Sequence, residues 1–123
     1  GQYYSNTDLL GEPALVRNDK EINFRWGKDA PAAGLPIDRF SVRWTRKVDF
    51  ERGVYRFCAT ADDGVRVSID GGMPFINEWH DSSGSTYCKD VQVVQGRHKI
   101  RVEYYDNLER AVIKFWWDRL ADG

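Results

Sequence analysis

The sequence predicts an all-β domain, an antiparallel sandwich or barrel of short strands with a jelly-roll-like arrangement. Apolar and polar residues alternate with a period of two in several short segments, which is typical of strands with one buried face. These segments recur about every 8–12 residues, and no segment shows sustained helical periodicity. Aromatic residues make up 14% of a chain that is 30% charged, which favours half-buried sheets over a helical bundle. We therefore expect about eight or nine strands.

The first half of the chain contains three predicted strands. They cover residues 2–4, 21–27 and 40–48 and are separated by segments that contain the turn residues Gly and Pro. The alternation in the second and third strands places these apolar side chains on the core: Ile22, Phe24, Trp26, Phe40, Val42 and Trp44. Residues 28–38 are rich in Pro and Gly and are expected to form a surface connection.

The second half opens with a central pair of strands, residues 55–59 and 65–69. Further strands are expected at residues 75–79, 91–94, 98–105 and 111–117. Polar loops are predicted at residues 80–85 and 106–110, and residues 114–120 are expected to fray into a turn. On the last strand, Trp117 has inward parity and Trp116 has outward parity. Trp116 is open to three interpretations: a sugar-stacking platform, a contact to an adjoining domain, or half-covered surface.

Length and charge limit the class of protein. A chain of 123 residues suffices for one core, so residues 1–123 are interpreted as a single domain excised from a larger protein. The net charge of −1 and the absence of a basic stripe argue against a nucleic-acid partner. No apolar run approaches the ~20 residues of a membrane span, and no signal peptide is recognised. The isolated domain is expected to be monomeric.

Two cysteines leave the redox state open. Counting by twos along their strands, Cys58 and Cys88 both point outward. If their strands are neighbours, the two thiols can form a disulfide whose loop of about 30 residues would contribute roughly 3–4 kcal/mol. Parity does not show that the strands are neighbours, so two free thiols are an equal alternative.

Two adjacent acids stand between the central strands. Asp62 and Asp63 repel each other and have no apolar role, and Gly64 follows them. A hard cation would resolve the repulsion, because calcium takes about six to eight oxygen ligands and carboxylates suit it. The alternative is a polar turn, since Asp and Gly are common turn residues.

The sequence does not indicate an enzyme. A serine hydrolase of the nucleophile-elbow type needs Gly-x-Ser-x-Gly, which is absent. The two histidines, His80 and His98, lack a second ligand at zinc-like spacing. His98 follows a predicted turn at Gly96 and is expected to make a local structural hydrogen bond.

Motifs spread over the whole chain occur in a fixed order. They include Leu10-Gly11-Glu12-Pro13, Phe40-Ser41-Val42-Arg43-Trp44, Gly53-Val54-Tyr55-Arg56-Phe57, Asp62-Asp63-Gly64-Val65-Arg66 and Val102-Glu103-Tyr104-Tyr105. In this order they resemble the fourteen-kilodalton domain of anthrax protective antigen. The resemblance implies a twisted antiparallel β-sandwich that occurs in bacterial toxins, glycosidases, secreted bacterial proteins and yeast adhesins. The commonest inferred role in that family is carbohydrate binding.

The resemblance also implies a metal site. In the lectin branch of the family, paired aspartates joined by a cis peptide bind one calcium ion, and here these are Asp62 and Asp63. The side chain of Asn107 is the expected third ligand, and backbone carbonyls near Glu109 and Ala111 complete the expected shell. The bound sugar is expected to contact Asp62, Asp63, Asn107, Glu109 and Arg110. Residues 108–110 replace a glycine-rich loop of many relatives, so the shape of the sugar pocket is expected to differ.

Two functions follow from these observations. The first is a calcium-dependent, lectin-like carbohydrate-binding module of a secreted or cell-surface multidomain protein, with a glycan as its ligand. The second is a structural or interaction domain that packs against neighbouring domains and binds no sugar. The segment 106–110 distinguishes between these two functions, because a ligand site requires Asn107 to lie beside Asp62 and Asp63.

Overall fold

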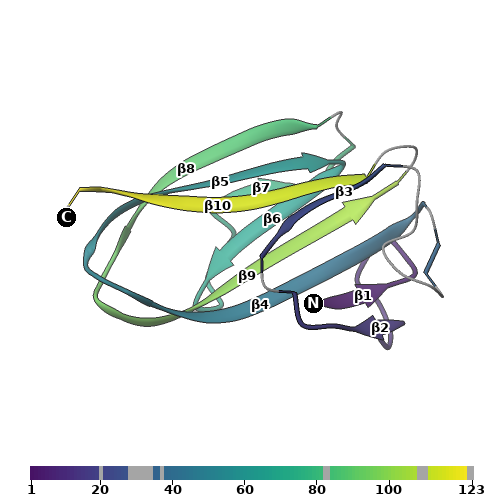
Figure 1. Cartoon of the computed structure of the whole chain (residues 1–123), viewed down its shortest axis with the longest axis horizontal. Helices are drawn as coiled ribbons and strands as arrows, with labels where there is room; N and C mark the ends of the chain where they lie inside the picture. Colours follow the sequence, from purple (N-terminus) through teal and green to yellow (C-terminus); the bar gives the residue numbers. More distant parts are fainter. Residues whose placement is uncertain (20, 28–34, 37, 82–83, 108–110, 122–123) are drawn as a thin grey trace.

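Two antiparallel sheets form a sandwich in the computed structural model, which describes residues 1–19, 21–27, 35–36, 38–81, 84–107 and 111–121 (Figure 1). The described residues contain no helix and ten strands: β1 (Gln2–Tyr4), β2 (Leu15–Val16), β3 (Asn23–Gly27), β4 (Phe40–Phe50), β5 (Gly53–Asp62), β6 (Gly64–Ile69), β7 (Ile76–Glu78), β8 (Ser85–Val93), β9 (Gly96–Asp106) and β10 (Ala111–Ala121). The predicted all-β class is therefore confirmed.

Successive strands mostly alternate between the two sheets. The larger sheet has six strands in the order β2-β1-β4-β9-β6-β7, and the smaller has four in the order β3-β10-β5-β8. All neighbouring pairs run antiparallel. Because β4, β6 and β9 lie in one sheet while β5, β8 and β10 lie in the other, the chain repeatedly crosses the edge of the sandwich. These crossings bring residues distant in sequence together at its two ends.

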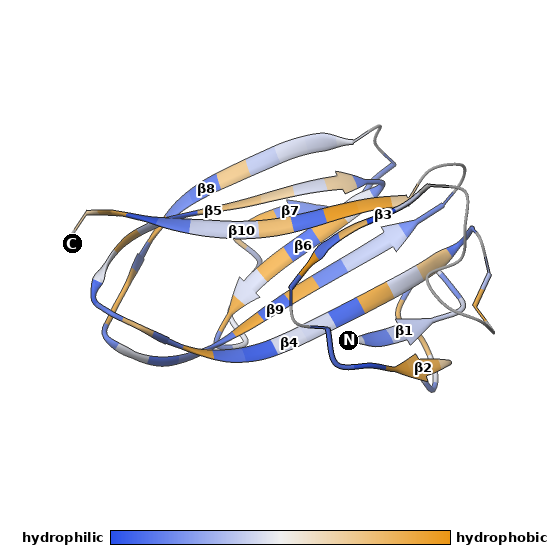
Figure 2. Ribbon diagram, viewed as in Figure 1, coloured by the Kyte–Doolittle hydropathy of each residue, from blue (hydrophilic) through white to orange (hydrophobic). Residues whose placement is uncertain are grey.

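The core lies between the inner faces of the two sheets. Figure 2 shows the alternation of hydrophobic and hydrophilic residues along β4, β6, β9 and β10 that the period of two predicts. Buried aromatic and β-branched residues fill the space: Tyr3, Phe40, Val42, Trp44, Tyr55, Phe57, Val65, Val67, Val102, Tyr104 and Ile113. Trp26 and Trp117 pack against this cluster, as their inward parity predicts, and the outward Trp116 is 39% exposed.

Three stretches of strand differ from the prediction. β2 has only two residues, which is too short for a periodic signal. β8 begins at Ser85 rather than residue 91, and its first half is almost wholly exposed on both faces. β10 continues to Ala121, so the expected turn at residues 114–120 is wrong. Backbone hydrogen bonds to β5 hold the last two of these stretches in place. Because such bonds do not depend on side chains, they leave no hydrophobic pattern in the sequence from which the strands could be predicted.

Cys58 and Cys88 occupy directly opposite positions of β5 and β8 on the outer face of the smaller sheet. The structure joins them in a disulfide, with a Cα–Cα distance of 4.2 Å. The two strands are thus neighbours, which parity alone left open.

Among the described residues there is no helix long and apolar enough to cross a membrane.

Candidate metal centre

The paired aspartates lie where the chain passes from one sheet to the other. Asp62 is the last residue of β5 in the smaller sheet, and β6 begins in the larger sheet at Gly64. Asp63 alone links the two strands, and the Asp62–Asp63 peptide bond is cis, as the family resemblance implies. Both carboxylates therefore stand at one end of the sandwich, between the ends of the two sheets.

Neighbouring strands hold this link through hydrogen bonds. The backbone N–H of Asp63 donates to the carbonyl oxygen of Tyr105 at 3.1 Å, and the hydroxyl of Tyr104 donates to the carbonyl oxygen of Asp62. The backbone N–H of Asn107 donates to Asp63 Oδ2 at 2.7 Å. Tyr104 and Tyr105 of β9, together with Asn107 just after it, thus fix the position of both aspartates.

Gly64 is required by close packing. A Cβ atom on this residue would lie 2.2 Å from Cε1 of the Tyr105 ring, far inside van der Waals contact. Gly64 and Tyr105 are directly paired between β6 and β9, so the ring covers the glycine. The glycine after the two acids therefore allows Tyr105 to pack over the strand.

A third acid, which was not predicted from the sequence, completes the cluster. Asp106 is the last residue of β9 and is fully buried, although residues 106–110 were expected to form a loop. Neither of its carboxylate oxygens has a hydrogen-bond partner. Counting by twos from Ile100 through Val102 and Tyr104 gives Asp106 inward parity. An acid at an inward position was the signal that could have identified it.

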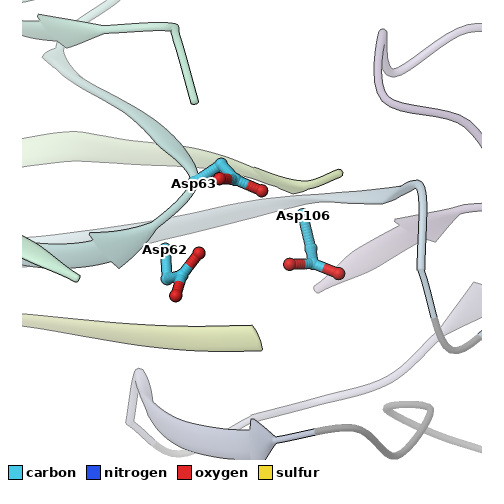
Figure 3. Close-up of side chains that lie close together, drawn as sticks. All are labelled: Asp62, Asp63 and Asp106. Atoms are coloured by element: carbon cyan, nitrogen blue, oxygen red, sulfur yellow. The ribbon is translucent and has the colours of Figure 1, made fainter. Parts of the chain in front are cut away.

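The three carboxyl groups are grouped around a common space (Figure 3). One oxygen from each of Asp62, Asp63 and Asp106 lies within 4.8 Å of the others. Burial, and after it the negative charges of neighbouring aspartates with Asp63 foremost, raises the pKa of Asp106 to about 8. Asp63 is also buried, while Asp62 is partly exposed. The cluster thus concentrates negative charge at a place where solvent reaches one side.

The side chain of Asn107 lies beside this cluster and contacts a fourth acid, Asp81, to which the sequence assigned no role. Its Nδ2 donates to Asp81 Oδ2 at 3.1 Å, and the Tyr105 hydroxyl donates to Asp81 Oδ1 at 2.9 Å. Burial and the bond to Asp81 raise the pKa of Tyr105, which keeps its hydroxyl protonated and able to donate. The backbone of Asn107 therefore reaches Asp63, while its side-chain amide reaches Asp81.

One of the remaining predicted ligands, Ala111, lies at the start of β10. Ala111 is buried and is the first residue of that strand, and the next residue, Val112, pairs directly with Asp62. The backbone of Ala111 is thus close to the cluster. Glu109 and Arg110 lie outside the described residues.

A shallow hollow of about 250 Å³ adjoins the cluster. Its walls are Thr7, Asp8, Trp79, Asp81, Tyr105 and Asn107. The guanidinium carbon of Arg66 lies 3.8 Å from the centre of the Trp79 ring, and the Tyr105 ring lies 4.8 Å from it. Asn107 and Tyr105 therefore belong both to the surroundings of the acids and to the wall of the hollow.

The residues present fit a hard divalent cation. The cluster offers only oxygen donors, and the buried, unpartnered oxygens of Asp106 are groups that a cation would satisfy. Zinc would instead favour histidine or cysteine, which the described cluster lacks.

Residues 1–120 match the family model for the PA14 domain. The chain is 34% identical over 119 residues to "Anti-sigma-I factor RsgI3" of Acetivibrio thermocellus, and the match covers 95% of this chain and 18% of that protein. The chain thus spans less than a fifth of the length of this relative.

Solved structures agree with the fold. An "anti-sigma factor domain-containing protein" superposes with a TM-score of 0.89 at 31% identity, covering 99% of this chain and 43% of that one. A "PA14 sugar-binding domain from RTX adhesin" superposes with a TM-score of 0.70 at 15% identity, covering 96% of this chain and 87% of that one, a likeness of fold alone. Because the family model matches residues 1–120 of its 123 residues, this chain belongs to the PA14 domain family.

Proposed function

We propose that this PA14 domain is a calcium-dependent carbohydrate-binding module and is not itself an enzyme. The observation that carries the proposal is the buried Asp106, whose two oxygens lack hydrogen-bond partners beside Asp62 and Asp63. An unpaired charge in a buried place is costly, and in native proteins such groups are paired or coordinate metals. A divalent cation would offset the repulsion among the three carboxylates.

Calcium is the cation that suits this site best. It takes oxygen ligands in a flexible shell, and backbone carbonyls and water complete the shell where carboxylates do not. The proposed shell contains Asp62, Asp63 and Asp106, with the carbonyl of Ala111 and the side chain of Asn107 as further donors. Glu109 and Arg110 remain proposed neighbours of the ligand.

The surroundings of the site favour a sugar as the ligand. Solvent reaches the cluster beside Asp62, so exchangeable positions on the cation would be open to paired hydroxyl groups. The adjoining hollow combines the aromatic ring of Trp79 with the polar side chains of Asp81 and Thr7. Apolar rings and convergent polar groups are the usual composition of small-ligand sites. One of the structural relatives is itself named as a sugar-binding PA14 domain.

The relatives suggest where such a module works. Two of them are named as anti-sigma factors, and in each the matched segment is less than half of the chain. We propose that this module is the ligand-sensing part of a longer regulatory protein and occupies an extracellular position. The Cys58–Cys88 disulfide supports that compartment, because disulfides persist in oxidising environments.

The proposal is tested by calcium titration and by glycan binding. Calorimetric titration of chelator-treated protein should give one calcium site, and glycan arrays should show signals that a chelator abolishes. At 100 times the dissociation constant, calcium that binds only the folded chain would add about 2.7 kcal/mol of stability. For a domain of this size that is a rise on the order of 10 °C in melting temperature.

A structural or interaction domain is the second candidate. The same acidic cluster would then bind calcium only to stabilise the connection between β5 and β6. Calcium binding without any glycan signal would assign that role, and a melting temperature that ignores both calcium and chelator would refute the metal site itself.

A further inference from the structure

Asp81 is an acid of the hollow that stands outside the proposed metal shell. The acids whose oxygens lie close enough to share one cation are Asp62, Asp63 and Asp106, and within the described part of the chain Asp81 does not belong to this group. Its side chain is exposed and lines the hollow, and each of its two oxygens accepts a hydrogen bond from a different side chain. Asp81 therefore contacts the metal centre only through other residues.

Tyr105 fixes one oxygen of this acid. The Tyr105 ring is buried, covers Gly64 of β6 and packs against Trp79, with 4.8 Å between the two ring centres. Its hydroxyl donates to Asp81 Oδ1 at 2.9 Å. Because the ring that carries this donor is packed on both sides, the hydroxyl holds the Asp81 carboxylate in place although that carboxylate is exposed.

The other oxygen of Asp81 determines which way the amide of Asn107 faces. Asp81 Oδ2 accepts from Asn107 Nδ2 at 3.1 Å, while the backbone N–H of Asn107 donates to Asp63 Oδ2 at 2.7 Å. A carboxylate can only accept hydrogen bonds, so it selects the nitrogen of the amide and leaves the amide oxygen for another partner. Among the residues that the structure describes, none donates to that oxygen, Asn107 Oδ1.

We propose that Asp81 is a positioning residue, which holds the Asn107 amide so that its oxygen is available to a cation at the acidic cluster. Calcium binds an asparagine through the amide oxygen and not through the nitrogen. Without Asp81, the amide is free to turn its nitrogen toward the cluster. Hydrogen bonds from outside the shell are a usual means of orienting metal ligands. The inference rests on the proposed function, because it requires calcium to bind at the three acids.

Three variants separate the orientation of Asn107 from the negative charge that Asp81 also supplies. Asp81→Asn removes the charge, but its oxygen can still accept from Asn107 and its amide can donate to the Tyr105 hydroxyl, which also accepts. Asp81→Ala removes the charge and both bonds. Asp8→Asn is the matched control, because Asp8 is another exposed acid of the hollow, and its side chain makes no hydrogen bond to any described residue.

The orientation of the amide is tested first without metal. In chelator, heteronuclear NMR follows the side-chain NH₂ group of Asn107, whose signals are identified by their absence in Asn107→Ala. We expect one proton of this group to be shifted by its hydrogen bond in the natural chain and in Asp81→Asn. Asp81→Ala should lose that shift, and Asp8→Asn should keep it.

Calcium titration and terbium luminescence then measure the effect on the shell. Terbium prefers oxygen ligands as calcium does, and its luminescence lifetimes in light and heavy water count the water molecules that it binds. Asp81→Ala should add about one bound water, where the Asn107 oxygen leaves, and should weaken calcium binding about tenfold or more relative to Asp8→Asn. Asn107→Ala should add the same water, and combining it with Asp81→Ala should add no other. Asp81→Asn should retain the water count of the natural chain.

The role of Asp81 is overturned if Asp81→Ala keeps the natural NH₂ signal or the natural water count, even where calcium binds. Equal losses of calcium affinity in Asp81→Ala and Asp8→Asn would reduce Asp81 to its charge and overturn the role as well. A natural chain that binds neither calcium nor terbium instead refutes the proposed function, and the inference with it, whatever the NH₂ signal shows.

Discussion

The backbone N–H of Asn107 donates to Asp63 Oδ2 at 2.7 Å, which ties the residue after β9 to the link between β5 and β6. This bond partners Asp63, but the adjacent Asp106 is fully buried with neither carboxylate oxygen hydrogen-bonded. The end of the sandwich is therefore well anchored in its backbone, while its side chains crowd three carboxyl groups together. That contrast is what a bound cation would explain.

Replacing Asp106 with Asn should have opposite effects with and without calcium. In chelator near neutral pH, Asp106→Asn should raise the melting temperature, because the carboxyl group, whose pKa is raised in the fold, must take up a proton on folding and the amide need not. For the natural chain, calcium is expected to raise the melting temperature by an amount on the order of 10 °C. In millimolar calcium, the variant should lose most of this rise, because it lacks one charged ligand. Thermal melts in both buffers measure this. Asp49→Asn, on an exposed acid paired with Arg97, is the control and should leave the calcium shift intact. A full calcium shift in Asp106→Asn would remove this residue from the shell.

Truncating Trp79 should separate sugar binding from metal binding. Trp79 lines the hollow beside Asn107 and packs under Arg66, but it is not one of the proposed metal ligands. Trp79→Ala should weaken glycan binding about tenfold or more, since aromatic contacts are among the larger contributions to binding. The calcium-induced rise in melting temperature should persist. Trp116→Ala is the matched control, because that exposed tryptophan lies on the outer face of the smaller sheet. Equal losses in both variants would contradict a specific role of the hollow.

Adding one methyl group at Gly64 should disturb the site through Tyr105. The new Cβ would meet the Tyr105 ring at 2.2 Å, so the ring must move and its bond to Asp81 must lengthen or break. We expect Gly64→Ala to destabilise the fold by about 1–3 kcal/mol, the usual cost of overpacking. Urea unfolding measures the loss. Tyr105→Leu in the same chain should recover part of it, and an additive double variant would argue against the clash.

The sequence predicts those parts of the fold that have one buried face. β4, β5, β6 and β9 were recognised because apolar residues alternate along them. The early half of β8 and the end of β10 were not, because backbone pairing with β5 stabilises them while most of their side chains are exposed. The Asp62–Asp63 pair was visible as adjacent charge without an apolar role. The sequence does not single out Asp106, because an acidic residue ordinarily marks the end of a strand, although the inward parity of position 106 places this one inside.

Removing the disulfide should lower stability without changing the sheet. Cys58 and Cys88 are separated by 30 residues, and closing such a loop contributes roughly 3–4 kcal/mol in the chain-entropy model. We expect the Cys58→Ala, Cys88→Ala double variant to lose about this much in urea unfolding and to retain its β circular dichroism. Intact mass of the natural chain after alkylation in denaturant without reductant should show no modified thiol. Two alkylated cysteines would contradict the bridge.

Stability should fall as the pH rises through the titration of His98. Its Nδ1 lies 2.5 Å from Asp70 Oδ2 and its Nε2 lies 2.8 Å from the carbonyl oxygen of Val94, so only the imidazolium can donate to both. The hydrogen bond to Asp70, then that to Val94, raises the pKa of His98. A group with a raised pKa in the folded state contributes stability that is fully present below its unfolded pKa of about 6.5. That contribution is lost as the pH rises through the higher, folded pKa.

NMR titration of the two histidines and urea unfolding from pH 5.5 to 8.5 check this prediction. His98→Gln keeps a hydrogen-bonding side chain but cannot titrate, so its stability should depend less on pH than that of the natural chain. His80 also has a raised pKa, through its bonds to the Asp81 carbonyl and to Glu78, but it is exposed. His80→Gln is therefore the control and should change the pH dependence less than His98→Gln. An unchanged slope in His98→Gln would show that the contacts to Asp70 and Val94 do not favour the protonated ring.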